Sequence, residues 1–97
     1  MAYRLVIKSL ATAEALEAFD YYESLPTKRG ERFFEELDAC YERILVHPTS
    51  FSYSNKPFRE MKMPHFPYVI IYQVIDEDVI VYSVFNTNQN PSRKPSA

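Results

Sequence analysis

The chain has 97 residues, of which 46% are hydrophobic and 15% aromatic, a composition that suits one domain with a modest core and excludes a largely disordered chain. Its net charge of −2 argues against a general electrostatic attraction to nucleic acid. One glycine and one cysteine exclude a glycine-rich nucleotide-binding loop, an internal disulfide and a cysteine-rich metal site.

Nothing in the chain resembles a targeting or membrane-spanning segment. The first ten residues lack the long apolar core of a signal peptide, and no apolar run is long enough to cross a bilayer. The lone Cys40 is compatible with a reducing compartment. We therefore expect a cytoplasmic protein that has no membrane partner and that uses no metal or cofactor.

The first part of the chain predicts a strand followed by a helix. Residues 3–8 alternate between two faces with a period of two, which is typical of a strand. Over residues 13–24 the apolar side chains recur at helical spacing and acidic ones line the remaining surface. Ser9 or Thr12 is the expected cap of this helix. The predicted buried face consists of Ala15, Leu16, Phe19, Tyr22 and Leu25.

A second helix follows after a short connection. Pro26 ends the first helix, and Thr27 is a plausible cap for the second. His47 precedes Pro48, which disfavours helical geometry and marks the end. The short connection predicts an antiparallel helical hairpin. Its second helix carries an apolar stripe of Phe33, Phe34, Leu37, Cys40, Tyr41, Ile44 and Leu45.

Residues 48–57 read as a loop of small polar residues and prolines, and residues 58–63 as a short strand. A tight turn around His65 follows, between Pro64 and Pro67. Pairing residue 63 with residue 68 places Met61 beside Ile70, and Lys62 beside Val69.

Residues 66–85 form two apolar runs separated by an acidic turn at Asp76–Asp78. Both runs are rich in Val, Ile and Tyr, so they predict a hairpin. Pairing residue 75 with residue 79 places Tyr72 opposite Tyr82, and Ile70 opposite Val84. The face with Met61, Met63, Tyr72 and Val84 is then expected to lie under the helices. The other face is expected to be apolar and open, with Val69, Ile71, Val81 and Phe85.

These elements predict an α+β fold of two layers in the order β-α-α-β-β-β. An antiparallel sheet would carry the N-terminal helical hairpin on one face. Residues 1–90 would form the single domain, and the polar, proline-containing residues 91–97 a flexible C-terminal tail.

Several short motifs, taken together in order and spacing, resemble the RelE/ParE toxin superfamily of type II toxin–antitoxin systems. They span nearly the whole chain, and the fold predicted from the residues agrees with that superfamily. The motifs are Tyr21-Tyr22, Gly30-Glu31-Arg32-Phe33, Glu36-Leu37, Ile44, Pro48, Phe58-Arg59-Glu60, Phe66-Pro67-Tyr68, Ile71-Tyr72 and Asn90-Pro91.

The resemblance implies a small toxin of the plasmid-stabilisation type that inhibits growth and is neutralised by a cognate antitoxin. Related toxins either poison DNA gyrase or cleave mRNA at the ribosome. Whether this chain is an enzyme therefore depends on the branch. A third possibility is a toxin-like fold that retains only antitoxin binding. The oligomeric state is open, with a dimer among the possibilities.

Cleavage of RNA needs a group that takes the 2′-hydroxyl proton, and cations near the phosphate. The resemblance implies Lys or Arg on the second and third strands, and Arg followed by Tyr or His after the fourth. Here Val69 stands at the third-strand position, and Asn86, Asn88 and Gln89 follow the fourth strand. If the chain is a nuclease, its catalytic candidates are Arg59, Lys62 and His65.

Each of these three residues also has a plain interpretation: an ion pair for Arg59, a solvated side chain for Lys62 and a locally hydrogen-bonded ring for His65. Because the nuclease positions are replaced and the chain is acidic, gyrase inhibition is slightly favoured over endoribonuclease activity. We expect the target to bind at Asn86, Gln89, Arg93 and Lys94, which follow the fourth strand. We expect the antitoxin to cover Val69, Ile71, Val81 and Phe85 on the open face.

Overall fold

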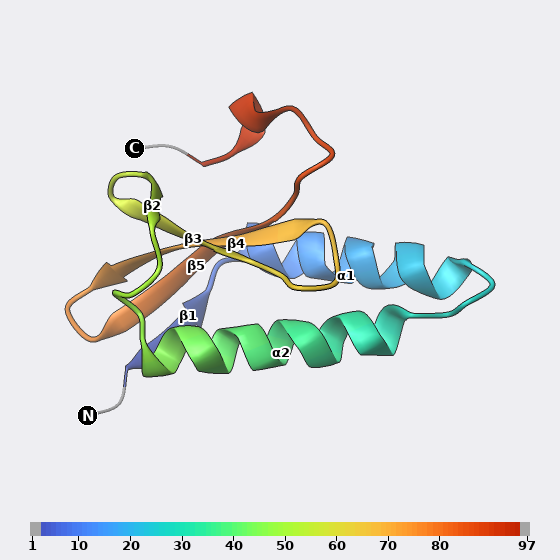
Figure 1. Ribbon diagram of the computed structural model, residues 1–97, viewed down its shortest axis with the longest axis horizontal. Coiled ribbons are helices and arrows are strands. Elements are labelled where there is room, and N and C mark those ends of the chain that lie inside the picture. Colours follow the sequence, from blue (N-terminus) through green and yellow to red (C-terminus); the bar gives the residue numbers. More distant parts are fainter. Residues whose placement is uncertain (1–2, 96–97) are drawn as a thin grey trace.

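The computed structural model describes residues 3–95 and contains one sheet and two long helices (Figure 1). Residues 1–2, and residues 96–97 of the predicted tail, lie outside the described residues. The elements are β1 (Arg4–Ile7), α1 (Ser9–Ser24), α2 (Gly30–Val46), β2 (Tyr53–Asn55), β3 (Phe58–Lys62), β4 (Tyr68–Ile75), β5 (Asp78–Asn86) and a short 3-10 helix (Pro91–Arg93).

The five strands lie in the order β1-β5-β4-β3-β2. The two helices run side by side along one side of the sheet, and the chain after β5 arches over the other side (Figure 1). The predicted α+β fold with a helical hairpin on one face is therefore confirmed. Two details differ: β1 pairs with β5 in parallel, and the loop before β3 contains the extra strand β2. All three residues of β2 are exposed, so no alternating pattern marks this strand in the sequence.

Both helices begin at positions other than those predicted. The N-cap of α1 is Lys8, without a side-chain cap, so neither Ser9 nor Thr12 caps this helix. The N-cap of α2 is Arg29 rather than Thr27.

Helix α1 buries Ala15 and Tyr22 as predicted, but its buried face also contains the small residues Ala11 and Ala18, and Leu16 does not belong to it. Leu16 is 53% exposed. The buried residues at helical spacing are Ala11, Ala15, Ala18 and Tyr22. Small side chains let the helix approach the sheet closely, which a large residue at the same positions would prevent.

The register of β3 against β4 is as predicted, with Met61 opposite Ile70 and Lys62 opposite Val69. In the β4–β5 hairpin, Ile70 lies opposite Val84, also as predicted. The predicted register near the turn is wrong. Residue 75 pairs with residue 78, and Tyr72 lies opposite Val81 rather than residue 82.

A bulge explains this difference. The register shifts between residues 71 and 72, where Ile71 pairs with Ser83 and Tyr72 with Val81, so that Tyr82 is the extra residue. A one-residue shift sends the following side chains to the other face of the sheet. Val81 therefore belongs to the core under the helices, where it is 0% exposed. The prediction that Val81 lies on the open face is wrong.

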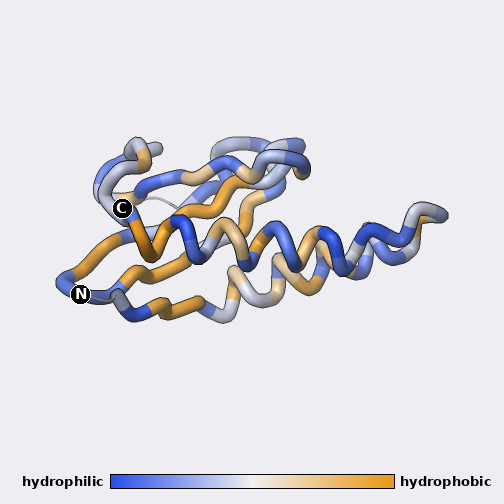
Figure 2. Tube along the Cα trace, turned by 60° about the horizontal axis from the view of Figure 1, so that its bottom comes forward, coloured by the Kyte–Doolittle hydropathy of each residue, from blue (hydrophilic) through white to orange (hydrophobic). Residues whose placement is uncertain are grey.

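The main core lies between the helices and the sheet. It contains Met61, Met63, Tyr72 and Val84, as predicted. Figure 2 shows hydrophobic residues along the strands and hydrophilic residues at the far end of the helical hairpin. Within residues 3–95, neither helix has the length and apolar content needed to cross a bilayer.

A second apolar cluster lies on the face of the sheet away from the helices, and we call it the outer cluster. It consists of Phe58, Val69, Ile71 and Phe85, with Tyr82 packed against it. Its four core members are 0–8% exposed, so the expectation of an open apolar face is wrong. The Nζ atom of Lys94 lies 5.7 Å from the centre of the Phe85 ring and 2.8 Å from Oε2 of Glu60. The chain after β5 therefore helps to cover this face.

Candidate functional site

A cleft of about 500 Å³ opens at one end of the sheet, between α1 and the neighbouring ends of β4 and β5. Tyr68, the first residue of β4, pairs with Asn86, the last residue of β5. The backbone N–H of Thr87 donates to the carbonyl oxygen of Pro67 at 2.8 Å, which holds the two strand ends together. The cleft is lined by Glu17, Ala18, Tyr21, Tyr22, Pro67, Tyr68, Asn86 and Asn88.

Three tyrosines form the aromatic part of the cleft. Tyr22 and Tyr68 are 9% and 6% exposed, whereas Tyr21 is 57% exposed. The Tyr21 and Tyr22 rings meet edge-on at 5.1 Å between centroids, and Tyr22 lies 6.5 Å from Tyr68. Tyr22, which belongs to the predicted buried face of the helix, is buried as expected, whereas its neighbour Tyr21 is exposed. Adjacent residues on a helix point about 100° apart, so the two rings could not share one buried stripe.

The cleft is lined by one acidic residue and by neutral residues, without a basic one. Burial raises the pKa of Tyr68 to about 12, and the nearby Tyr22, Glu17 and Tyr21 contribute less to this increase. The hydrogen bond to Asn86 acts in the opposite direction and lowers the pKa. Burial also raises the pKa of Tyr22. Both hydroxyls are therefore neutral near pH 7, and Glu17 carries the only formal charge among the lining residues.

The asparagine-rich turn after β5 is organised by its own side chains. Oδ1 of Asn86 accepts from the backbone N–H of Asn88 at 2.9 Å. Oδ1 of Asn90 accepts from the N–H of Ser92 at 3.0 Å. Asn86 thus lines the cleft, and the exposed Gln89 lies just beyond it.

The other two residues predicted to bind the target lie further along the chain. Arg93 ends the 3-10 helix and is exposed. Lys94 is held by Glu60 beside the outer cluster. The four predicted residues therefore do not form one compact group.

His65 is bound to α2. Its backbone N–H donates to Oε2 of Glu36 at 2.8 Å, and its Nδ1 lies 2.8 Å from Oε1 of the same carboxylate. The carboxylate thus ties the turn between β3 and β4 to the helix.

Arg59 is bound to the loop before β3. Its guanidinium donates to the Phe51 carbonyl oxygen at 2.7 Å and to the Tyr53 hydroxyl at 2.9 Å. It also lies 4.1 Å from the centre of the Tyr53 ring. Lys62 is exposed and pairs with Val69 of the outer cluster. Arg59 and Lys62 are three residues apart in one strand, so they point to opposite faces. The structure therefore does not bring Arg59, Lys62 and His65 together.

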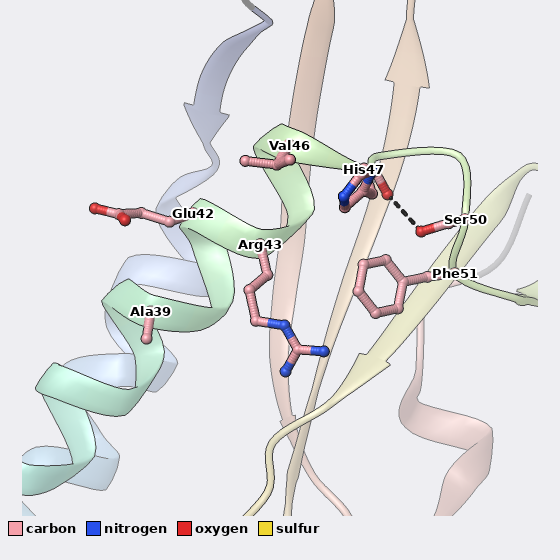
Figure 3. A pocket seen from close by; sticks show the side chains of 7 residues that line it. All are labelled: Ala39, Glu42, Arg43, Val46, His47, Ser50 and Phe51. Atoms are coloured by element: carbon pink, nitrogen blue, oxygen red, sulfur yellow. Dashed lines mark hydrogen bonds between the residues drawn. The ribbon is translucent and has the colours of Figure 1, made fainter.

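A second cavity of about 620 Å³ lies beside the end of α2 (Figure 3). The carbonyl oxygen of His47 accepts from Oγ of Ser50 at 2.9 Å at its edge, and Glu42 points away from it (Figure 3). The lining offers one guanidinium, that of Arg43, and its acid and base, Glu42 and His47, point in different directions (Figure 3). It is formed by Ala39, Glu42, Arg43, Val46, His47, Ser50 and Phe51.

Within residues 3–95, no three His, Cys, Asp or Glu side chains are grouped so that they could hold a metal ion. Cys40 is buried, and burial raises the pKa of its thiol to about 11, which keeps the thiol protonated and unreactive.

Sequence reasoning missed the cleft itself, apart from Asn86. Glu17 was interpreted as part of a solvated helix face, and it is indeed exposed. Only the position of α1 over the sheet brings Glu17 and Tyr21 next to Tyr68. A signal was available in Tyr21, a large aromatic residue outside the buried helical stripe.

Residues 5–91 match the family model described as the ParE toxin of the type II toxin–antitoxin system parDE. A chain from the chromosomal ParDE system of P. aeruginosa superposes with a TM-score of 0.77 at 10% identity, covering 87% of this chain and 95% of that chain. The isolated E. coli RelE toxin superposes with a TM-score of 0.59 at 24% identity, covering 94% of this chain and 90% of that chain. A mutant of E. coli RelE in the free state superposes with a TM-score of 0.55 at 24% identity, covering 89% of this chain and 84% of that chain. At these identities the structures show a shared fold. A comparison with curated proteins found no match.

Proposed function

The chain belongs to the ParE toxin family of type II toxin–antitoxin systems, and from that premise we propose that it inhibits growth by binding DNA gyrase in the cytoplasm. A cognate antitoxin neutralises it. The target contacts the cleft and the turn after β5, at Asn86 and Gln89, with Arg93 and Lys94 as further contacts from the chain that follows.

The observation that carries this proposal is the separation of the three nuclease candidates. RNA cleavage requires a base and a cation around one phosphate. Arg59 is engaged by Phe51 and Tyr53, His65 is engaged by Glu36, and Lys62 lies on the face away from the helices. Inhibition by binding requires none of these three groups.

The charge of the chain supports the same proposal. A net charge of −2, and a cleft whose only formal charge is a carboxylate, disfavour an RNA backbone as the bound ligand. Both features are compatible with a protein target.

We further propose that the antitoxin binds on the outer cluster, at Val69, Ile71 and Phe85. These side chains are buried in the free chain, and Lys94 lies over the Phe85 ring, so the antitoxin would have to displace Lys94 to reach Phe85. Val81 is not part of this proposed antitoxin surface, because it lies in the core under the helices.

The test is a supercoiling assay with purified gyrase, relaxed plasmid and increasing amounts of the chain. We expect loss of supercoiling, with restoration when the cognate antitoxin is added first. A parallel assay mixes the chain with translating ribosomes and examines the mRNA for cleavage. Cleaved mRNA together with unaffected gyrase would overturn the proposal in favour of endoribonuclease activity. No effect in either assay, with antitoxin binding intact, would indicate an inactive toxin-like fold.

A further inference from the structure

We propose that the cleft between α1 and the ends of β4 and β5 binds an arginine side chain presented by the target protein, an inference that rests on the proposed function. Three features support it: an exposed tyrosine ring, a carboxylate without a cationic partner in the cleft, and side-chain oxygens that can accept hydrogen bonds. These are contributed by Tyr21, Glu17 and the pair Asn86 and Asn88.

The exposed ring offers a surface on which a guanidinium can stack. Tyr21 is 57% exposed at the cleft, and planar guanidinium groups bind well to aromatic faces. The chain already uses this contact twice. The guanidinium of Arg59 lies 4.1 Å from the centre of the Tyr53 ring, and that of Arg29 lies 4.8 Å from the centre of the Phe66 ring.

The polar groups of the cleft complement a cation. Glu17 is exposed and has no ion pair among residues 3–95. The asparagine side chains and the tyrosine hydroxyls add neutral oxygen atoms that can accept hydrogen bonds. No lining residue is Lys, Arg or His, so the phosphate of a nucleotide would meet no compensating charge.

The geometry favours arginine over lysine. A guanidinium presents its N–H groups in a fixed fork, so it can bind a carboxylate and stack on an aromatic ring at once. The compact ammonium of lysine lacks the planar surface for stacking. The cleft volume of about 500 Å³ leaves room for the backbone on either side of such a residue.

The cleft is continuous with the proposed target surface rather than with the antitoxin surface. Asn86 belongs both to the cleft and to the turn that we propose binds the target. The outer cluster, proposed for the antitoxin, lies on the opposite side of the sheet from the helices, whereas the cleft includes one face of α1.

The experiment is an NMR titration of the free, full-length chain with the peptide acetyl-Gly-Arg-Gly-amide. The matched control peptide contains citrulline, a neutral isostere of arginine. We expect saturable shifts at Tyr21, Tyr68, Asn86 and Asn88 with the arginine peptide, and weak shifts with the citrulline peptide. Equal binding of both peptides, or shifts confined to the acidic turn at Asp76–Asp78, would overturn the proposal. So would tighter binding of a short oligouridylate at the same residues.

Variants assign the contacts. Glu17→Gln should lower the affinity of the chain for the arginine peptide about three- to fivefold, as expected for an exposed ion pair. Tyr21→Ala should also lower this affinity, whereas Tyr21→Phe, which keeps the ring, should bind the peptide as the unaltered chain does. Asp20→Asn is the matched control, because residue 20 is exposed on the same helix and does not line the cleft. Unchanged binding by Glu17→Gln and Tyr21→Ala would overturn the proposal.

The gyrase assay separates this inference from the proposed function. If the cleft binds the target, Glu17→Gln and Tyr21→Ala lower gyrase inhibition and leave antitoxin binding intact. If both variants inhibit gyrase fully and instead lose antitoxin binding, the assignment to the target is overturned. If the unaltered chain does not inhibit gyrase, the proposed function fails, whereas the peptide titration still reports whether the cleft binds arginine.

Discussion

Glu14 in α1 completes the sheet at Ser83. Its Oε1 accepts a hydrogen bond from the Ser83 hydroxyl at 2.7 Å and one from the backbone N–H of Val84 at 2.9 Å. The pairing of β1 with β5 ends at Ile7 and Val81, so β5 continues without a partner strand on that side. The carboxylate provides the acceptor that a longer β1 would have supplied.

Removing this carboxylate should destabilise the fold. In Glu14→Ala, the Ser83 hydroxyl, in a side chain that is 1% exposed, and the Val84 N–H lose their acceptor. A buried donor left without an acceptor costs about 1–3 kcal/mol, so we expect the free energy of unfolding in urea to fall by an amount in that range. Asp20→Ala on the same helix is the control and should change it little. Equal stability of the Glu14 and Asp20 variants would contradict the proposed role.

The same carboxylate should give the stability a specific pH dependence. Burial raises the pKa of Glu14 above 4.5, against the hydrogen bonds from Ser83 and Val84. The folded chain therefore binds a proton at the Glu14 carboxyl more tightly than the unfolded chain does. This tighter proton binding stabilises the fold below pH 4.5, and the stabilisation is lost as the pH rises through the pKa of Glu14 in the folded chain. Relative to Glu14→Gln, the unaltered chain should lose stability on this pH increase. Urea titrations of both proteins across this interval measure the difference, and parallel curves would contradict it.

The Glu36–His65 contact predicts a structural rather than a catalytic role for this histidine. Glu36→Ala removes the acceptor of the His65 backbone N–H and the partner of its ring. Because the His65 side chain is 64% exposed, we expect a loss of only about 0.5–1.5 kcal/mol in unfolding free energy. His65→Ala keeps the backbone hydrogen bond and should lose less. Growth inhibition by His65→Ala should stay within about twofold of the unaltered chain. A drop of a hundredfold or more, typical of a lost proton-transfer group, would support the nuclease alternative.

The single glycine is required by helix packing. A Cβ atom at Gly30 would lie 2.8 Å from two atoms of the Phe19 ring and from Oε2 of Glu23. The Phe19 ring is stacked on Phe34 at 4.7 Å between centroids, which restricts its movement. Gly30→Ala should therefore lower the free energy of unfolding by about 1–3 kcal/mol, although alanine is the better helix former. Thermal unfolding measures this effect, and the double variant with Phe19→Leu should recover part of the loss. A more stable Gly30→Ala protein would show that the helices can separate freely.

The sequence predicts those parts of the fold that depend on local periodicity. The Ile70–Val84 pair was predicted from the wrong pairing of residue 75 with residue 79, and it is right because the bulge at Tyr82 offsets that one-residue error. The β3–β4 register follows from alternation and from the turn around His65. The bulge at Tyr82 does not, because alternation is intact on either side of it and no glycine marks it. Its consequence is the transfer of Val81 from the expected outer face to the core. One extra residue in a strand thus changes a predicted binding residue into a packing residue.

The site was less predictable than the fold. Asn86 could be placed at the strand end from the sequence, because a strand end follows from the apolar pattern. The approach of Glu17 and Tyr21 to Tyr68 depends on how α1 crosses the sheet, which is determined by the small residues of its buried face. Periodicity identifies that face but does not give the crossing angle.

The covered outer cluster gives the last prediction. Lys94 contacts Glu60 and the Phe85 ring, so its aliphatic stem shields apolar surface while its charge is paired. Lys94→Ala should expose part of Phe85 and lower the free energy of unfolding by about 1 kcal/mol or less. It should also raise the fluorescence of the dye ANS, which binds exposed apolar surface. Arg93→Ala is the control, since Arg93 is exposed next to it. If Lys94→Ala and Arg93→Ala bind ANS equally, Lys94 does not cover the cluster in solution, and an antitoxin could reach Phe85 without displacing it.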